Sequence, residues 1–282
     1  MAVDTFVPEL WSAILLKGLE ASHVATNLVN RDYEGEIRNA GDTVHINSFS
    51  PVTIKGYTKN SNIEEAERLT TTDQTLVINQ SKYFNFGLDD VDKAQALGGL
   101  MERAMRSAAY GLADVADKFL FKTMAAGAKT TIGTTGTAAV QLTAANIYEE
   151  IVKVGVALDK KNVPSEGRWI VLPPEAKGLL LLEDRFVSTG GAKAEEVIRK
   201  GYIGEVAGFE VFISNNLSSD GDQEVNILAG TREATTYAEQ IIKTEAYRKE
   251  KGFEDGVKGL HVYGAKVTQG DQLVKLIAKF TP

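Results

Sequence analysis

The strongest hydrophobic pattern in the chain lies in residues 89–127, where it predicts one long helix. Apolar residues recur there every three or four positions along one face: Leu97, Met101, Ala104, Ala108, Leu112, Val115 and Phe119. Charged residues fall off that face: Glu102, Arg103, Arg106, Asp114, Asp117 and Lys118. Such a helix would be about 55 Å long at 1.5 Å per residue. That length suits the backbone of a thin domain rather than the centre of a deep catalytic pocket.

The ends and the glycines of this pattern add three expectations. Carboxylates at the predicted start favour the positive end of the helix dipole: Asp89, Asp90 and Asp92. At the other end, Gly127 is a candidate left-handed stop. Inner glycines weaken a helix, so we expect close packing or a bend at Gly98, Gly99 and Gly111.

Residues 41–87 read as a long hairpin. Residues 43–47 alternate between apolar and polar as a half-exposed strand does, and a return strand runs from Thr72 through Ile78 to Phe86. The insert between them is polar and has few apolar residues. A hairpin with such a tip has little of its own to bury, so it is a poor element in a monomer. It makes sense if it lies on another subunit.

Shorter elements follow the long helix. Residues 129–141 are a Gly/Thr-rich connector, and a helix capped by Thr143 or Asn146 runs to about Leu158. The remaining predicted elements are a buried strand at 169–172, a helix after Pro173 and Pro174 to about Leu182, strands at 209–213, 226–229 and 273–278, and a late hairpin of residues 234–248 and 259–267. The predicted class is α+β with one dominant helix.

Residues 1–40 begin as a loose arm and then show a helical pattern. Its apolar positions lie roughly on one side: Trp11, Leu15, Leu19 and Val24. Such an arm could pack on its own domain or reach across a neighbour, and the pattern leaves both alternatives open.

Composition excludes several classes of function. The chain has 282 residues and no cysteine, so disulfides and thiolate chemistry are excluded. Its net charge is -7, from 31 basic and 38 acidic residues, which argues against a dedicated nucleic-acid reader. The N-terminus shows no signal peptide, and the longest aliphatic run, 179–182, is too short to span a bilayer. We therefore predict a soluble protein that is made in a cytoplasm.

Candidate chemistry is weak throughout. The histidines His23, His45 and His261 lie in separate segments without carboxylates at ligand spacing, so we expect no metal site and ordinary surface or strand roles. Residues 220–224 resemble the opening of a calcium loop, but the glycine and the final Glu of that motif are missing. The glycine-rich stretches at 189–193 and 201–204 lack phosphate-loop and dinucleotide spacing. We predict no enzyme and no cofactor.

The order of the elements is distinctive: arm, long hairpin, long helix, α/β portion and late hairpin. It resembles the major capsid (coat) proteins of tailed double-stranded-DNA bacteriophages, which have the Hong Kong phage capsid fold. The resemblance covers nearly the whole chain. It is carried by the segments GDTVHI, TLVINQSKYFNFG, DDVDKAQA, RWIVLPPEA, GEVAGFEVFISNNL and GLHVYGAKV.

The resemblance implies a division of the chain. Residues 1–40 would be an N-terminal arm and residues 41–87 an extended loop that overlaps a neighbouring subunit. Residues 88–142 and 233–267 would form a peripheral domain with the long helix as its spine. Residues 143–232 and 268–282 would form an axial domain around fivefold and sixfold axes.

The resemblance also implies a function and partners. The chain would self-assemble into pentamers and hexamers of an icosahedral head that encloses double-stranded DNA without reading its sequence. Assembly would occur in the bacterial host cytoplasm, with a separate scaffolding protein, a portal and a decoration protein as partners, and the product would be the virion capsid. Subunit-contact residues would lie at the loop tip, on the spine helix and at the late hairpin tip: Lys55, Gly56, Tyr57 and Lys59; Arg103 and Arg106; and Phe253, Glu254 and Asp255.

Two features differ from some members of that family. Some begin with a removable scaffolding region of about a hundred residues, whereas here the pattern starts almost at Met1. We therefore expect a separate scaffold or a chain in mature form. Some members crosslink a loop lysine to a neighbour's asparagine, but Lys55 and Lys59 have no identifiable acceptor here, and solvated lysines are the simpler interpretation.

Two rival functions remain. One is an encapsulin-like nanocompartment shell, which would hold cargo enzymes instead of DNA. The other is a small-molecule enzyme that uses residues 143–230, which would need a convergent polar pocket.

Overall fold

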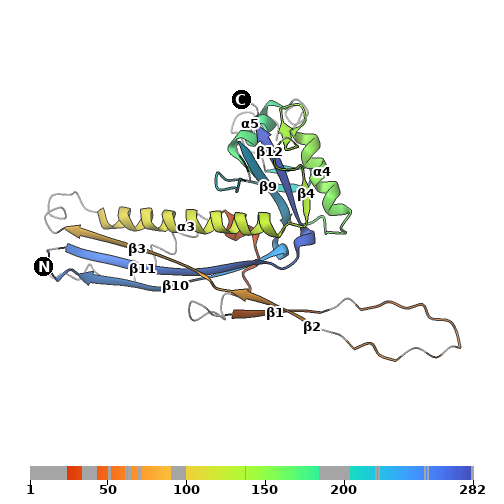
Figure 1. Cartoon of the computed structure of the whole chain (residues 1–282), viewed down its shortest axis with the longest axis horizontal. Coiled ribbons are helices and arrows are strands. Elements are labelled where there is room, and N and C mark those ends of the chain that lie inside the picture. Colours follow the sequence, from red (N-terminus) through yellow and green to blue (C-terminus); the bar gives the residue numbers. More distant parts are fainter. Residues whose placement is uncertain are drawn as a thin grey trace.

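The computed structural model describes residues 24–33, 43–49, 52–60, 62, 65–68, 71–89, 100–136, 138–183, 204–219, 221, 223–250, 252 and 254–280. In this part of the chain, a long helix and sheet form an elongated body, an α/β unit rises at one end of it, and a thin hairpin projects beyond the same end (Figure 1). The predictions for residues 1–23, 90–99, 184–203 and 253 lie outside the described residues.

The elongated body is helix α3 (Leu100–Gly127) against an antiparallel sheet of order β10–β11–β3 (Figure 1). The strands are β3 (Gln80–Asp89), β10 (Thr235–Arg248) and β11 (Glu254–Val267). Met101, Met105 and Ala109 of α3 pack with Val257 of β11 in one apolar cluster, against which Phe84 is also packed. The late hairpin predicted from the sequence is therefore confirmed as β10–β11, with register pairs from Thr235–Val267 to Arg248–Asp255.

The α/β unit is built on a sheet of order β4–β12–β9–β6–β8–β7, with β5 also paired to β12. Its elements are β4 (Thr130–Ile132), β5 (Val140–Leu142), α4 (Ile147–Asp159), β6 (Arg168–Leu172), α5 (Pro174–Leu182), β7 (Glu205–Val206), β8 (Phe209–Ile213), β9 (Glu224–Thr231) and β12 (Leu273–Phe280). The predicted apolar face of α4, from Ile147 to Leu158, is buried, as is every residue of β6. The predicted connector 129–141 contains the short strand β4 and the first two residues of β5.

The projecting hairpin pairs β1 (Thr43–Phe49) with β2 (Thr71–Val77). Val44 and Ile46 alternate inward and pack with Leu76, Ala238 and Val262. The described residues also form three short 3-10 helices: η1 (Ala25–Leu28), η3 (Arg232–Ala234) and η4 (Gly270–Gln272).

Several sequence predictions about the long helix are wrong. Asp89 ends strand β3 opposite Glu254 instead of opening the helix. Val115 is 40% exposed, because the buried stripe runs through Met105, Ala109 and Ala116. Alanines dominate this helix and are too small to show which face is apolar. Asp117, predicted on the polar side, is buried.

The glycine and hairpin predictions also need correction. A Cβ at Gly111 would meet no atom within 4 Å, so nothing packs closely there. Gly127 is not left-handed, but a Cβ there would lie 2.4 Å from Cγ2 of Val267. The predicted single return strand breaks after Val77 into β2 and β3, which belong to different sheets. Asn146 precedes α4, but its side chain bonds Thr143 and Gln141 instead of capping the helix.

Candidate assembly interface

The loop beyond β1 and β2 exposes apolar side chains that its own chain does not cover. Residues 52–60 and 65–68 are all exposed and follow a drawn-out path away from the body (Figure 1). The legs of the loop are joined where the backbone N–H and the hydroxyl of Thr53 both donate to the Glu67 carboxylate, each at 3.2 Å. Ile54 is 92% exposed, Tyr57 70% and Val52 61%. Exposed apolar side chains gathered on one projection mark a surface for another protein.

The neck of this hairpin is fixed to the body. The Gln74 side-chain amide donates to the Thr268 carbonyl at 3.4 Å, and Lys266 Nζ donates to the Thr75 carbonyl at 3.0 Å. The two bonds hold β2 beside the end of β11 and the connection that leads from β11 to β12. The loop therefore projects from a fixed base.

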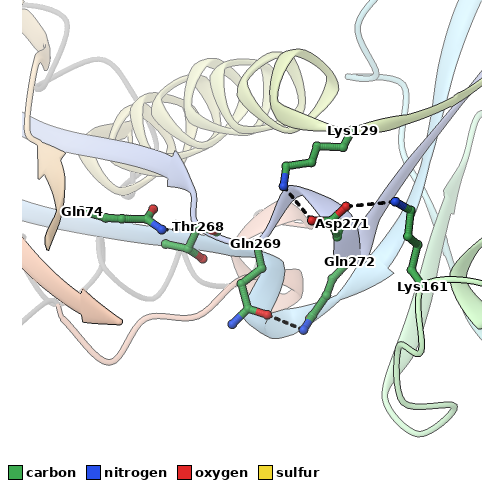
Figure 2. Close-up of polar contacts among 7 residues, drawn as sticks. All are labelled: Gln74, Lys129, Lys161, Thr268, Gln269, Asp271 and Gln272. Atoms are coloured by element: carbon green, nitrogen blue, oxygen red, sulfur yellow. Dashed lines mark hydrogen bonds and ion pairs between the residues drawn. The ribbon is translucent and has the colours of Figure 1, made fainter. Parts of the chain in front are cut away.

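The same connection joins the helix–sheet body to the α/β unit, and Figure 2 shows its polar contacts. Asp271 accepts hydrogen bonds from Lys129 at 2.6 Å, directly after α3, and from Lys161 at 3.3 Å, after α4. The two lysines hold the pKa of the Asp271 carboxyl below its ordinary value, because both favour its charged form. Gln269 and Gln272 bond each other across the same turn.

The N-terminal segment 24–33 is tied to the body at several points. The Asp117 carboxylate accepts hydrogen bonds from the backbone N–H groups of Val24, at 3.0 Å, and Ala25, at 3.3 Å. Asn30 then exchanges backbone hydrogen bonds with Thr235 and Tyr237 at the edge of β10, each 2.9 Å long. This part of the predicted arm packs on its own chain.

A buried polar network holds the end of that segment. Glu239 accepts hydrogen bonds from Arg31 at 2.9 Å and from the Tyr237 hydroxyl at 2.8 Å, and lies 3.0 Å from His261 Nε2. Burial, with the Glu239 carboxylate beside it, raises the pKa of the Tyr237 hydroxyl well above its ordinary range. His261 lies in strand β11 and is 1% exposed, so of the two roles predicted for it, surface or strand, it has the strand role. The network couples the arm segment to the sheet.

Comparison with known proteins assigns this architecture to a family. A family model described as phage capsid protein matches residues 72–276. The chain belongs to the phage capsid protein family. A solved structure from Mycobacterium phage Che8 is 31% identical with a TM-score of 0.74, and the match covers 92% of this chain and 91% of that one. No curated protein matches the chain.

Two further structures share the fold at lower identity. The capsid of Cyanophage P-SCSP1u is 15% identical with a TM-score of 0.67, covering 87% of this chain and 85% of its own. A virus-like particle from Pyrococcus furiosus is 12% identical with a TM-score of 0.55, covering 95% and 98%. The prediction of a tailed-phage major capsid protein with the Hong Kong phage capsid fold is confirmed. The family implies a structural role in the virion, within a self-assembled shell.

The structure places the predicted contact residues of this capsid protein in three separate regions. Lys55, Gly56, Tyr57 and Lys59 are exposed at the loop tip. Arg103 is exposed on α3, and Arg106 forms an i,i+4 ion pair with Glu102 on the same helix. The loop and the outer end of the late hairpin lie at opposite ends of the molecule (Figure 1). One subunit therefore does not bring these groups together.

The late hairpin tip uses its charges internally. Glu254 pairs with Lys249 at 2.9 Å, and Asp255 pairs with Arg248 at 2.8 Å, both across the β10–β11 turn. The Asp255 side chain is only 18% exposed. Both carboxylates stiffen the tip.

Neither a cluster of His, Cys, Asp and Glu metal ligands nor a membrane-spanning helix is present among the described residues. They contain no group of three or more His, Cys, Asp and Glu residues placed to hold a metal ion. Glu224, from the sequence that resembles a calcium loop, is buried; it accepts a hydrogen bond from the Gly136 N–H at 2.7 Å and pairs with Lys279 at 3.2 Å. No helix in the described ranges combines the length and the apolarity that a membrane span requires.

Sequence reasoning missed the residues that fix the loop base and the arm. Asp271 meets Lys129 across 142 positions, and Arg31 meets Glu239 across 208. Neither pair has a local sequence signal, because a partner this distant is defined only by the fold. Exposed aromatic residues on the body, Tyr83 at 78% and Tyr110 at 65%, were also missed.

Proposed function

We propose that this capsid protein self-assembles into pentamers and hexamers that close an icosahedral shell around double-stranded DNA. The observation that carries the proposal is the projecting loop, whose Ile54 is 92% exposed. Burying one such side chain is worth about 1.5–3 kcal/mol, and a monomer forgoes that gain. Closed symmetry repeats each contact around a ring, so modest contacts add up to a stable shell.

The proposed division of labour follows the resemblance. Residues 41–87 overlap a neighbouring subunit, and residues 88–142 with 233–267 form the peripheral domain. Residues 143–232 with 268–282 form the axial domain, which gathers around the fivefold and sixfold axes. Residues 1–40 form the arm, of which residues 24–33 are bonded to the body.

The contact residues proposed for assembly fall into three groups along the sequence. Lys55, Gly56, Tyr57 and Lys59 contact a neighbour through the loop tip. Arg103 and Arg106 do so from the exposed side of α3. Phe253, Glu254 and Asp255 mark the late hairpin tip, which meets other subunits near threefold positions.

DNA is held by enclosure in this proposal. The net charge of -7 argues against tight binding to phosphates, so the shell holds the DNA by surrounding it. The protein therefore binds no particular DNA sequence, and it catalyses no reaction. Its proposed partners are a separate scaffolding protein, a portal and a decoration protein, with assembly in the bacterial host cytoplasm.

Deleting residues 52–68 tests the role of the loop. The β1–β2 neck and the rest of the core stay intact, so the variant is expected to keep the circular dichroism spectrum and thermal unfolding of the full chain. It is expected to form no closed particles under conditions in which the full chain does. Particles of unchanged size and yield, seen by negative-stain electron microscopy, would refute the role of the loop.

A nanocompartment shell is the second candidate. It is favoured by the match to the Pyrococcus furiosus virus-like particle. That match covers nearly all of both chains, but at 12% identity it shows only that the fold is shared. Particles purified from infected cells distinguish the two functions. Nuclease-protected genome-length DNA supports a phage head, whereas a co-purifying protein cargo without DNA supports the nanocompartment.

A further inference from the structure

Two residues at the start of strand β9 carry buried oxygen atoms that receive no hydrogen bond from the described part of the chain. Glu224 is 2% exposed and Asn226 is 0% exposed. No described residue donates to Oε2 of Glu224 or to Oδ1 of Asn226. Buried acceptors in folded proteins are nearly always satisfied, because leaving one without a donor costs free energy. Two such oxygens on one strand therefore point to a ligand.

Both side chains lie on the same face of the α/β sheet. Positions 224 and 226 are two apart in a strand, so their side chains point to one side. Leu228 continues that side, whereas Ile227 packs on the opposite side in the cluster that contains the apolar face of α4. Leu217 packs against the cluster of Leu228, so the loop that precedes β9 passes over this face.

That loop is bonded to both residues. The backbone N–H of Asn226 donates to the Ser218 carbonyl at 2.9 Å, and its side-chain amide donates to the Ser218 hydroxyl at 3.1 Å. The Glu224 N–H donates to the Gly221 carbonyl at 3.3 Å, and a Cβ at Gly221 would lie 2.8 Å from Glu224 Oε2. The Ser219 hydroxyl also donates to the Gly221 carbonyl, at 2.6 Å. The carboxylate and the carboxamide are thus held against one loop.

The other oxygen of the Glu224 carboxylate is already matched. Its Oε1 accepts a hydrogen bond from the Gly136 N–H at 2.7 Å and lies 3.2 Å from Lys279 Nζ. Lys279 also donates to the Gly136 carbonyl at 2.9 Å. It stands opposite Glu224 where β12 pairs with β9 (Figure 1). These contacts fix the carboxylate and leave Oε2 for a further partner.

We propose that Glu224 Oε2 and Asn226 Oδ1 bind a calcium ion, with main-chain oxygens of the loop and water as its other ligands. The inference goes beyond the proposed function and does not depend on it. Carboxylate, amide and carbonyl oxygens in an irregular arrangement suit Ca²⁺, whereas Mg²⁺ demands a near-ideal octahedron and zinc is bound mainly by Cys and His. With one carboxylate as ligand, the expected Kd is about 10⁻⁴–10⁻³ M, as in weak calcium modules.

The charges around the site allow a cation to bind beside Lys279. The Lys279 side chain is 26% exposed, so water screens its ammonium, whereas the Glu224 carboxylate is buried. The sequence adds two further acidic residues, Asp220 and Asp222, next to Gly221. They lie outside the described residues and are not counted as ligands.

Calcium titration of the full chain, unassembled and first treated with EDTA, tests the site. Calorimetry is expected to show saturable binding, and calcium at about ten times its Kd is expected to raise the Tm by about 3 °C. Glu224→Gln keeps an acceptor for Gly136 and is expected to lose both effects. The matched control is Glu210→Gln, at an exposed position of β8 in the same sheet, which should keep both. No saturable binding up to about 10 mM calcium, well above the expected Kd, would overturn the inference.

Asn226→Asp distinguishes a bound cation from a bound water molecule, and it replaces Glu224→Gln if that variant does not fold. Without calcium, a second buried carboxylate near that of Glu224 should lower the Tm, because the two like charges repel. With calcium, the added ligand charge should restore the Tm and lower the Kd at least about tenfold. A Tm that stays low in calcium would overturn the inference, because water at these oxygens does not respond to calcium. The shell function stands in either case.

Discussion

Asp117 defines where the N-terminal arm meets the body. It is 2% exposed in the middle of the long helix, and its carboxylate receives the backbone N–H groups of Val24 and Ala25. Those donors open the turn η1, whose Ala25 and Leu28 are buried in the core beside α3. The Asp117 carboxylate, on an otherwise apolar face of α3, thus anchors the N-terminal segment that packs on this face.

Asp117→Ala is expected to lower the free energy of unfolding by about 1–3 kcal/mol, because the buried backbone N–H of Ala25 and the half-buried one of Val24 lose their acceptor. Urea unfolding of the unassembled chain measures this change. The control is Asp114→Ala, which removes only an i,i+4 pair on the surface and should cost about 0.3–0.5 kcal/mol. Equal effects of the two substitutions would contradict the anchoring role of Asp117.

Asp271 makes the stability of the junction depend on pH. Its pKa in the folded chain lies below the ordinary 3.8, so its contribution is fully present above that value and is lost as the pH falls through the folded pKa. Asp271→Asn should therefore lower the urea midpoint at neutral pH, and the difference from the natural chain should vanish in acid. A difference that persists unchanged at low pH would show that Lys129 and Lys161 do not act through this carboxylate.

At the scale of elements, glycines along α3 test how closely the helix is packed. Gly111→Ala is expected to stabilise the chain by about 0.4–1 kcal/mol, because an added Cβ meets no atom and helix propensity improves. Gly127→Ala is expected to destabilise it by about 1–3 kcal/mol, because the new methyl group would overlap Val267. Thermal unfolding of both variants gives the comparison. The same sign for both would contradict the packing described for the helix end.

The sequence predicts an element well when one local pattern determines it. The apolar face of α4 from Ile147 to Leu158 and the buried strand β6 are confirmed because their side chains are large and regularly spaced. The face of α3 is shifted because alanines carry little information. The return strand of the hairpin divides into β2 and β3 because the chain changes sheets at Ile78, a choice made by tertiary packing.

The candidate site could be predicted only in part. The length and polarity of residues 41–87 identify the loop, but not which of its side chains are exposed. The outer part of the β10–β11–β3 sheet brings together residues distant in sequence: Lys258 pairs with Glu245, and the Tyr247 hydroxyl donates to Asn85. Such sites form from the fold and leave no local motif.

At the scale of the whole molecule, the fold separates a fixed body from a projecting loop whose described residues, 52–60 and 65–68, are all exposed. The neck contacts of Gln74 and Lys266 and the Asp271 junction set the direction of that projection. We propose that a subunit of this shape gains stability from its neighbours in the shell, where symmetry repeats each contact. Its function is therefore a property of the assembly.

The most direct test is size-exclusion chromatography followed by negative-stain electron microscopy, on the chain expressed alone and with a candidate scaffolding protein. The account predicts rings of five and six subunits or closed particles in at least one of these conditions. A monodisperse monomer in both conditions would contradict the central claim that the chain builds a shell.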